Sequence, residues 1–317
     1  MTVPDPSNIK IVFMGTPDFA RVCLEELAKS GYDIVLAVTQ PDKPVGRKHI
    51  LTPPPVKVCA NSLGIPVYQP DSFKSDEAYD VVRNAAPDLI VTAAYGKILP
   101  QRILDIPRFG PLNVHGSLLP LRRGAAPVQR SVLEGDKVTG VTIMKMDAGM
   151  DTGDILSSVE YDIPTDMHAK DLMGELAEAG AALLVKTIPL YLEGSLTPVP
   201  QNGDLATYSP PLEASEGLID WNAPASSVHN RIRALSEWPG AYTFMNGKKL
   251  KIYDSSISDV DTKGYNAGTV IKPDKKTIIA VCGEGSVKIN VLQPEGGKVL
   301  AASDIAHNIA EGTILGA

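Results

Sequence analysis

The sequence predicts two domains, an α/β domain with a mainly parallel sheet and then a small β-barrel. The chain has 317 residues, which exceeds the size that one hydrophobic core usually serves. Apolar runs alternate with helical patterns over the first part of the chain, as they do in parallel α/β sheets. Short strand candidates separated by glycines follow in the last third, a pattern typical of a small barrel.

The first strand, helix and second strand can be read directly from the start of the chain. An apolar run over 9–14 predicts a strand that ends at Gly15. Thr16 can then cap a helix, with Pro17 in its first turn. Apolar residues recur at helical spacing before the next apolar run at 34–38, so the chain opens with a βαβ unit.

The remaining pattern gives the domain boundaries. We predict further strands over 89–94 and 138–146 and helices over 56–63, 77–84, 126–133 and 168–192. Proline, glycine and polar residues then gather as they do in linkers. The prediction is a first domain over 1–192, a linker over 193–210, and a barrel domain over 211–317 with strands near 242–244, 250–253, 277–281 and 287–292.

Composition excludes several classes of protein. Apolar residues make up 44% and charged residues 21%, which argues against disorder. A net charge of -7 argues against a chain that binds nucleic acid over its whole surface, so RNA contacts must be local. The local candidates are the cluster at 43–48 and the cluster of Arg122, Arg123 and Arg130. No apolar run is long enough for a membrane span and no signal peptide is visible, so we expect a cytoplasmic protein.

The three cysteines are too far apart and too few for a disulfide framework or a closely spaced zinc motif. We expect them to be reduced core residues. The turn at 15–19 lacks the spaced glycines of dinucleotide- and triphosphate-binding loops, and a well-capped turn explains it without a ligand.

Asn113 and His115 are the first candidate for chemistry. They are two residues apart, so in an extended segment both side chains project to one face. An amide donor and an imidazole would then converge, and Gly116 favours close approach by a ligand. A structural role explains a histidine at a strand end equally well.

The segment 146–154 is the second candidate, because it carries three aspartates in a glycine-bearing loop after a strand. It lacks the alternating ligands and terminal glutamate of a calcium-binding EF-hand. A carboxylate that orients and charges His115 is the better use, while others of these aspartates serve as turn or capping residues.

Taken together, these motifs closely resemble the methionyl-tRNA formyltransferase family over nearly the whole chain. The matching runs are G-T-P-D-F from Gly15, Q-P-D-K-P-V-G-R from Gln40, N-V-H-G-S-L-L-P from Asn113, R-G-A-A-P-V-Q-R from Arg123 and D-x-G-x-D-T-G-D from Asp147.

The resemblance implies a Rossmann-like catalytic domain, a linker and an OB-like barrel. It implies transfer of a formyl group from 10-formyltetrahydrofolate to the α-amine of initiator methionyl-tRNA, without a metal and by a monomer. By matching position, the catalytic residues are Asn113, His115 and Asp151, the folate donor lies near Ser117, Leu118, Leu119 and Pro120, and the tRNA contacts come from Lys43, Arg47 and Lys48.

Two alternatives stay open at this point. One is a formyltransferase that acts on a small amine, such as a nucleotide sugar or glycinamide ribonucleotide, with the same catalytic residues. The other is an RNA-binding protein without activity. In the barrel, Lys248, Lys249 and Lys251 are either an RNA-binding stripe or ordinary surface lysines.

Overall fold

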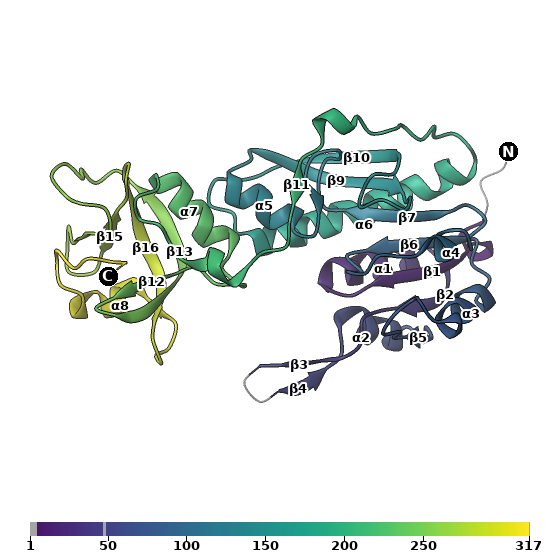
Figure 1. The fold of residues 1–317 in the computed structure, drawn as a ribbon, viewed down its shortest axis with the longest axis horizontal. Helices are drawn as coiled ribbons and strands as arrows, with labels where there is room; N and C mark the ends of the chain where they lie inside the picture. The colour runs from purple at the N-terminus through teal and green to yellow at the C-terminus, as the bar shows by residue number, and fades with distance from the viewer. Residues whose placement is uncertain (1–4, 47–48, 317) are drawn as a thin grey trace. The chain divides into compact units, whose positions relative to one another are not determined.

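The computed structural model describes residues 5–46 and 49–316 of the chain, which fall into two compact units (Figure 1). Neither unit is continuous in sequence, because two segments from the middle of the chain belong with the C-terminal part. The first unit contains Met1–Pro127, Val138–Asp162 and Met173–Ser209, and the second contains Val128–Lys137, Ile163–Leu172 and Pro210–Ala317.

A seven-stranded sheet forms the centre of the first unit, drawn from purple to teal in Figure 1. The five strands β7, β6, β1, β2 and β5 are parallel, whereas β9 and β10 are antiparallel to their neighbours. The predicted mainly parallel sheet is therefore confirmed. In spatial order the strands are β10 (Ile155–Asp162), β9 (Val138–Lys145), β7 (Pro111–His115), β6 (Leu89–Ala93), β1 (Lys10–Gly15), β2 (Asp33–Val38) and β5 (Val67–Tyr68).

Helices cover both faces of this sheet. On one face, Val12 and Met14 of β1 pack in a cluster with residues of α3 (Asp76–Asn84) and α4 (Gln101–Leu104). On the opposite face, α6 lies close to β7 and β9, since a Cβ at Gly180 would lie 3.0 Å from side-chain atoms of Val114 and Val141. The further helices of this unit are α1 (Asp18–Lys29), α2 (Pro55–Ser62) and most of α6 (Ala169–Leu192), with 3-10 turns at Pro6–Asn8 and Gly203–Leu205, whereas α5 (Pro127–Glu134) belongs to the second unit except for Pro127.

The predicted capping role of Thr16 is wrong. Helix α1 begins at Asp18 with Pro17 as the preceding cap residue, and no side chain caps it. The Thr16 hydroxyl instead donates to the carbonyl oxygen of Tyr95 (3.2 Å) and accepts from the Gln40 N–H (3.4 Å). Thr16 therefore connects the chain segments at the carboxyl ends of β1, β2 and β6. These partners are distant in sequence, so local helix propensity does not predict them.

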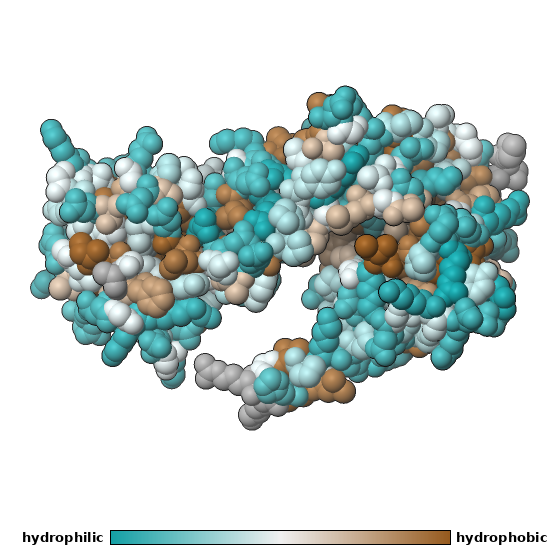
Figure 2. All heavy atoms as spheres, viewed as in Figure 1, coloured by the Kyte–Doolittle hydropathy of each residue, from teal (hydrophilic) through white to brown (hydrophobic). Residues whose placement is uncertain are grey.

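A two-stranded hairpin, β3 (Lys43–Val45) and β4 (Ile50–Thr52), follows β2 and leaves its apolar side chains in solvent. Figure 2 shows them as brown atoms in the lower middle of the view. Its base is held by Lys57, which donates to Asp42 (2.8 Å) and to Gln69 (2.7 Å). Together with Gln69, the Lys57 ammonium lowers the pKa of the Asp42 carboxyl.

The segment 193–210, expected to be a linker, is bonded to the first unit along its length. Val199 and Ile155 exchange two backbone hydrogen bonds of 2.8 Å. Further on, β11 (Tyr208–Ser209) pairs in parallel with β8 (Arg123–Gly124). A Cβ at Gly124 would meet the Ser209 carbonyl oxygen at 2.7 Å, so only glycine allows this approach.

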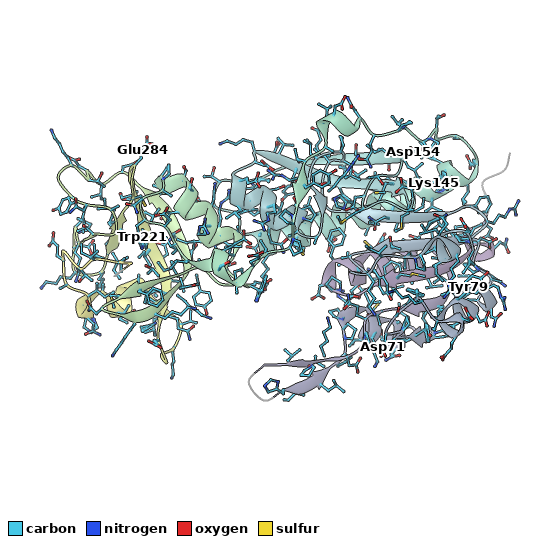
Figure 3. The ribbon with its side chains drawn as sticks, viewed as in Figure 1. Asp71, Tyr79, Lys145, Asp154, Trp221 and Glu284 are labelled. Carbon is cyan, nitrogen blue, oxygen red and sulfur yellow. The ribbon has the colours of Figure 1, made fainter. Side chains whose placement is uncertain are left out.

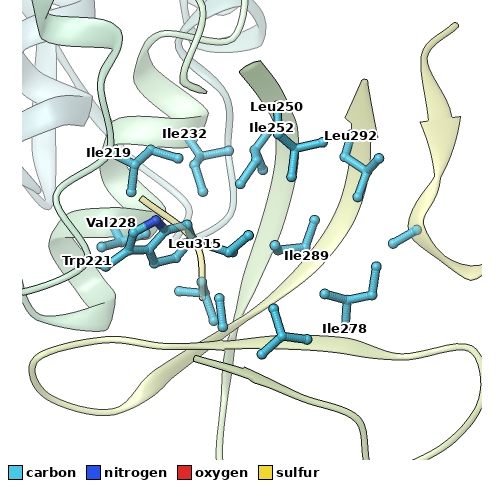
Figure 4. Packing of buried hydrophobic residues seen from close by; sticks show 14 of the residues in the cluster. Ile219, Trp221, Val228, Ile232, Leu250, Ile252, Ile278, Ile289, Leu292 and Leu315 are labelled. Carbon is cyan, nitrogen blue, oxygen red and sulfur yellow. The ribbon is translucent and has the colours of Figure 1, made fainter. Parts of the chain in front are cut away.

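An antiparallel sheet and two helices form the C-terminal part of the second unit. The last residues close the sheet, because Leu315 bridges to Met245 beside one edge and Ile314 bridges to Thr269 beside the other. The strands are, in order, β12 (Tyr242–Met245), β13 (Lys248–Ser258), β16 (Ser286–Pro294), β15 (Ile278–Val281) and β14 (Val270–Ile271), with β17 (Leu300–Ala301) beside β16. Figure 4 shows the core, where side chains of α7 (Ala225–Ala234) face those of β13 and β16.

The remaining short elements of this unit are helix α8 (Ala302–Ile305) and 3-10 turns at Ala214–Gly217 and Ala306–Asn308. The four predicted barrel strands correspond to β12, β13, β15 and β16, and the predicted small barrel is confirmed.

Candidate active site

Asn113 and His115 lie on β7, two residues apart at the carboxyl end of the strand, as the sequence predicts. Strand β9 holds this end of β7, because Asn113 pairs with Met144 and His115 with Thr142. The Thr92 hydroxyl donates to the amide oxygen of Asn113 at 2.7 Å. With its oxygen engaged, the Asn113 side chain has its N–H groups left to donate to a ligand.

His115 is buried, with 6% of its surface exposed, and both ring nitrogens face polar atoms. Nε2 lies 3.1 Å from the carbonyl oxygen of Arg122, so this nitrogen carries a hydrogen in any protonation state. Nδ1 faces the Asp151 carboxylate at 3.6 Å. That separation is too long for a hydrogen bond, but protonation of Nδ1 makes it a close ion pair.

The Asp151 loop connects β9 to β10. Asp151 has a φ of +56°, a left-handed conformation that costs an L-residue about 1 to 2 kcal/mol and must be held by its surroundings. The Gly124 N–H donates to its Oδ2 at 2.8 Å. Because Gly124 is fixed by β11, the carboxylate is aimed from outside its own loop.

The side chain of Asp147 and the backbone of Asp154 make hydrogen bonds within this loop and to its base. Asp147 accepts from the Gly149 N–H (3.0 Å) and from the Thr152 hydroxyl (2.7 Å), which makes it the predicted turn residue. The Asp154 carbonyl oxygen accepts from the Lys145 N–H at 2.8 Å, and this closes the loop where both residues are labelled in Figure 3.

A cavity of about 130 Å³ opens beside Asn113 and Asp151. Its remaining walls come partly from the predicted segment 146–154 and partly from residues that the sequence pattern does not single out, although Gly96 after a buried strand is a usable signal for a binding loop. They are Lys97, Ile98, Leu99, Met144, Met146, Asp147, Ala148, Gly149 and Met150.

The predicted donor-binding residues, Ser117, Leu118, Leu119 and Pro120, are absent from the walls of this cavity in the part of the chain that the structure describes. Instead they are packed against β9. Thr142 accepts from the Leu119 N–H and donates to the Ser117 carbonyl oxygen, while the Ser117 hydroxyl donates to the Leu121 carbonyl oxygen (2.7 Å).

Of the predicted tRNA-binding residues, Lys43 lies on β3, is exposed, and donates to the Gln40 side chain at 3.0 Å. Arg47 and Lys48 lie outside the described residues. The second basic cluster is not a free charged surface, since Arg123 and Arg130 are buried. Arg130 forms a salt bridge with Glu216 (2.5 Å) and lowers the pKa of that carboxyl.

All three cysteines are buried and unpaired, as predicted. Burial raises the pKa of Cys59 to about 11 and that of Cys282 to about 12, so these thiols are not nucleophiles near neutral pH. Within residues 5–46 and 49–316, no group of three acidic, histidine or cysteine side chains is arranged for a metal. No helix among them is long and apolar enough to cross a membrane.

Comparison with known proteins agrees with this geometry. The formyl transferase family model matches residues 9–188, and the model of the formyl transferase C-terminal domain matches 211–309. A methionyl-tRNA formyltransferase of Macrococcus caseolyticus is 46% identical over 94% of this chain and 95% of its own length. The chain belongs to the methionyl-tRNA formyltransferase family. The member from Acetivibrio thermocellus is 43% identical over 97% of this chain and 100% of its own length.

A solved structure with a similar fold is an N-formyltransferase from Helicobacter canadensis. It has a TM-score of 0.67 and 21% identity, with 89% of this chain and 98% of that chain covered. This similarity supports the fold, a Rossmann-like first part followed by a barrel, in a structure with low sequence identity to this chain.

Gly153 gives the first prediction, because a Cβ there would lie 1.8 Å from the Lys145 carbonyl oxygen. Gly153→Ala should displace the Asp151 loop and cost about 1 to 3 kcal/mol of stability. Gly174 in α6 is the matched control, since nothing lies within 4 Å of a Cβ there. Gly174→Ala should stabilise by about 0.5 to 1 kcal/mol. Denaturant unfolding of both variants checks this, and equal stability of the two contradicts the close packing of the loop.

Proposed function

We propose that this protein transfers the formyl group of 10-formyltetrahydrofolate to the α-amine of methionyl-tRNA, with Asn113, His115 and Asp151 as its catalytic residues. The observation that carries the proposal is that Asn113 and Asp151 line one cavity while the Asp151 carboxylate faces the buried His115 imidazole at 3.6 Å. Sequence identity of 43% and 46% to two methionyl-tRNA formyltransferases, over nearly the full length of the chain, supports the choice of substrate.

The chemistry begins with attack of the neutral methionine amine on the formyl carbon. A new C–N bond forms, the carbonyl oxygen becomes an oxyanion, and the bond to the folate nitrogen then breaks as that nitrogen takes up a proton. Asn113 lines the cavity, and its side-chain N–H groups would stabilise the oxyanion. Removal of one such donor commonly costs about 2.7 to 4 kcal/mol of the barrier.

His115 and Asp151 would handle charge and protons. Because Nε2 is committed to the Arg122 carbonyl oxygen, Nδ1 is the nitrogen that gains or loses a proton during the reaction. Asp151 would stabilise the imidazolium and receive the amine proton through water.

The donor would enter the cavity between the 97–99 segment and the Asp151 loop. Its methionine and aliphatic walls suit a flat ring, and its few polar groups suit orientation of the formyl end. The 10-formyltetrahydrofolate brings an activated formyl group, so the protein's residues supply position and electrostatics. Contact of Ser117–Pro120 with the rest of the donor stays a prediction.

The tRNA would bind through local basic surfaces, since the whole chain is acidic. The hairpin with Lys43 is one such surface, and Arg47 and Lys48 belong to the same part of the sequence. In the barrel, Lys249 lies over the Tyr242 ring at 3.6 Å, which holds one lysine of the proposed stripe in place. Preference for initiator tRNA, a monomeric state and a cytoplasmic location are parts of this proposal.

A substrate comparison tests the proposal. The full-length protein should convert methionyl-tRNA and 10-formyltetrahydrofolate to formylmethionyl-tRNA with a kcat/KM roughly 1,000-fold or more above that for amino sugar nucleotides or glycinamide ribonucleotide, on the order expected for a fitted substrate. Acid gel electrophoresis and mass spectrometry of the product measure it. A higher kcat/KM for a small amine would replace the tRNA substrate, and inactivity toward all amines would favour an RNA-binding protein without activity.

Lys43 gives a prediction for the tRNA. Lys43→Gln should raise the KM for methionyl-tRNA by roughly threefold to tenfold and reduce the salt dependence of binding by about one counterion, because one phosphate contact is lost. The KM for the donor should not change. Lys29→Gln is the matched control. Lys29 is exposed at the end of α1, just before the amino end of β2, whereas Lys43 follows the carboxyl end of β2. If both variants have the same KM for tRNA, Lys43 is not at the RNA surface.

A further inference from the structure

Gln201 connects the segment after α6 to the loop that carries Asp151. Its Nε2 donates to the Asp151 carbonyl oxygen at 2.9 Å and to the Gly153 carbonyl oxygen at 2.7 Å. Its Oε1 accepts from Nε (3.0 Å) and Nη2 (2.7 Å) of Arg123. One amide group is therefore hydrogen-bonded on both sides, to the Asp151 loop and to a buried arginine.

The orientation of this amide follows from its partners. Two carbonyl oxygens can only be met by the NH2 end, and the arginine N–H groups can only be met by the oxygen. In a flipped amide, the oxygen would face the two carbonyl oxygens and the NH2 group would face the arginine N–H groups. Gln201 therefore fits this place in one orientation, and neither a carboxylate nor an apolar side chain of the same size supplies both kinds of contact.

The segment that carries Gln201 is itself fixed on both sides. Val199 is bonded to Ile155, and the Thr207 carbonyl oxygen accepts from the Arg123 N–H at 2.9 Å. The same segment then pairs with Gly124, whose N–H holds the Asp151 carboxylate. The backbone and the side chain of Asp151 are thus positioned from one stretch of chain, 199–209, which lies far from it in sequence.

We propose that Gln201 is a positioning residue, which keeps Asp151 in its left-handed conformation and thereby keeps the carboxylate aimed at His115. The inference rests on the proposed function of Asp151. Gln201 itself does not line the cavity, so we expect its main effect on the catalytic step and a smaller effect on donor binding through the Asp151 loop.

Gln201→Met tests this with a side chain of similar length and shape. Loss of the contacts should let the loop shift, and a displacement of about 1 Å at a catalytic group can lower kcat by roughly 100-fold. We expect kcat to fall between about tenfold and 100-fold, with a smaller rise in the KM for the donor, whose cavity the loop borders, and with the KM for methionyl-tRNA unchanged within about twofold. Asn202→Ala is the control, because Asn202 is the next residue, is exposed, and accepts locally from the Asp204 N–H (3.1 Å). Its kcat should equal that of wild type.

Gln201→Glu separates the two sides of the amide. A glutamate still accepts from Arg123 but has no N–H for the Asp151 and Gly153 carbonyl oxygens. The positioning role predicts a loss of kcat similar to that of Gln201→Met. Wild-type turnover of Gln201→Glu would overturn the proposal, because the residue would then serve only Arg123. This variant also gives an answer if Gln201→Met does not fold.

Two further readouts identify the path of the effect. In an Asp151→Asn background, Gln201→Met should cost less than about twofold in kcat, because the group that it positions has already lost its charge. A full multiplicative loss would contradict action through Asp151. Hydrogen exchange of the 147–154 amides should accelerate in Gln201→Met while the barrel is unchanged. That measurement needs no turnover, so it fails separately from the proposed function, which fails if wild type does not formylate methionyl-tRNA.

Discussion

The site depends on a carboxylate held beside a buried imidazole by a loop that would not adopt its shape alone. Asp151 is held in a left-handed conformation, and His115 is only 6% exposed, so the imidazole has little water with which to replace the carboxylate. The Gly124 N–H aims the carboxylate, and the Arg122 carbonyl oxygen fixes which ring nitrogen faces it. Gly124 and Arg122 lie in the same stretch after β7. The geometry of this stretch therefore orients both the Asp151 carboxylate and the His115 ring.

The segment 193–210 has the composition of a linker but is hydrogen-bonded to the first unit. Proline, glycine and polar residues usually indicate a linker. Here the segment instead pairs with Gly124 through β11, and its Gln201 donates to the carbonyl oxygens of the Asp151 loop. Removal of the chain from Gln201 onward would remove these contacts as well as the barrel, so such a truncation does not report on the barrel alone.

Local pattern predicts much of the fold and the identity of the convergent residues. Strand β7 places Asn113 and His115 on one face because alternation in an extended chain is a local property. The roles of Thr16 and Gln201 cannot be predicted in this way, because their partners, Tyr95 and Asp151, are distant in sequence. The cavity escapes prediction for the same reason, since its walls come from separate segments that only the sheet brings together.

The most direct test of this account is the coupling between His115 and Asp151 in the chemical step. Single-turnover formyl transfer to methionyl-tRNA should be measured at saturating donor for wild type, His115→Ala, Asp151→Asn and the double variant. The amide introduced by Asp151→Asn retains an acceptor for the Gly124 N–H, so the change removes charge and not the fold of the loop. The account predicts that each single change slows transfer by roughly 100-fold to 1,000-fold and that the double variant is little slower than the slower single variant. Near-normal transfer by Asp151→Asn, or independent and fully multiplicative losses, would contradict it.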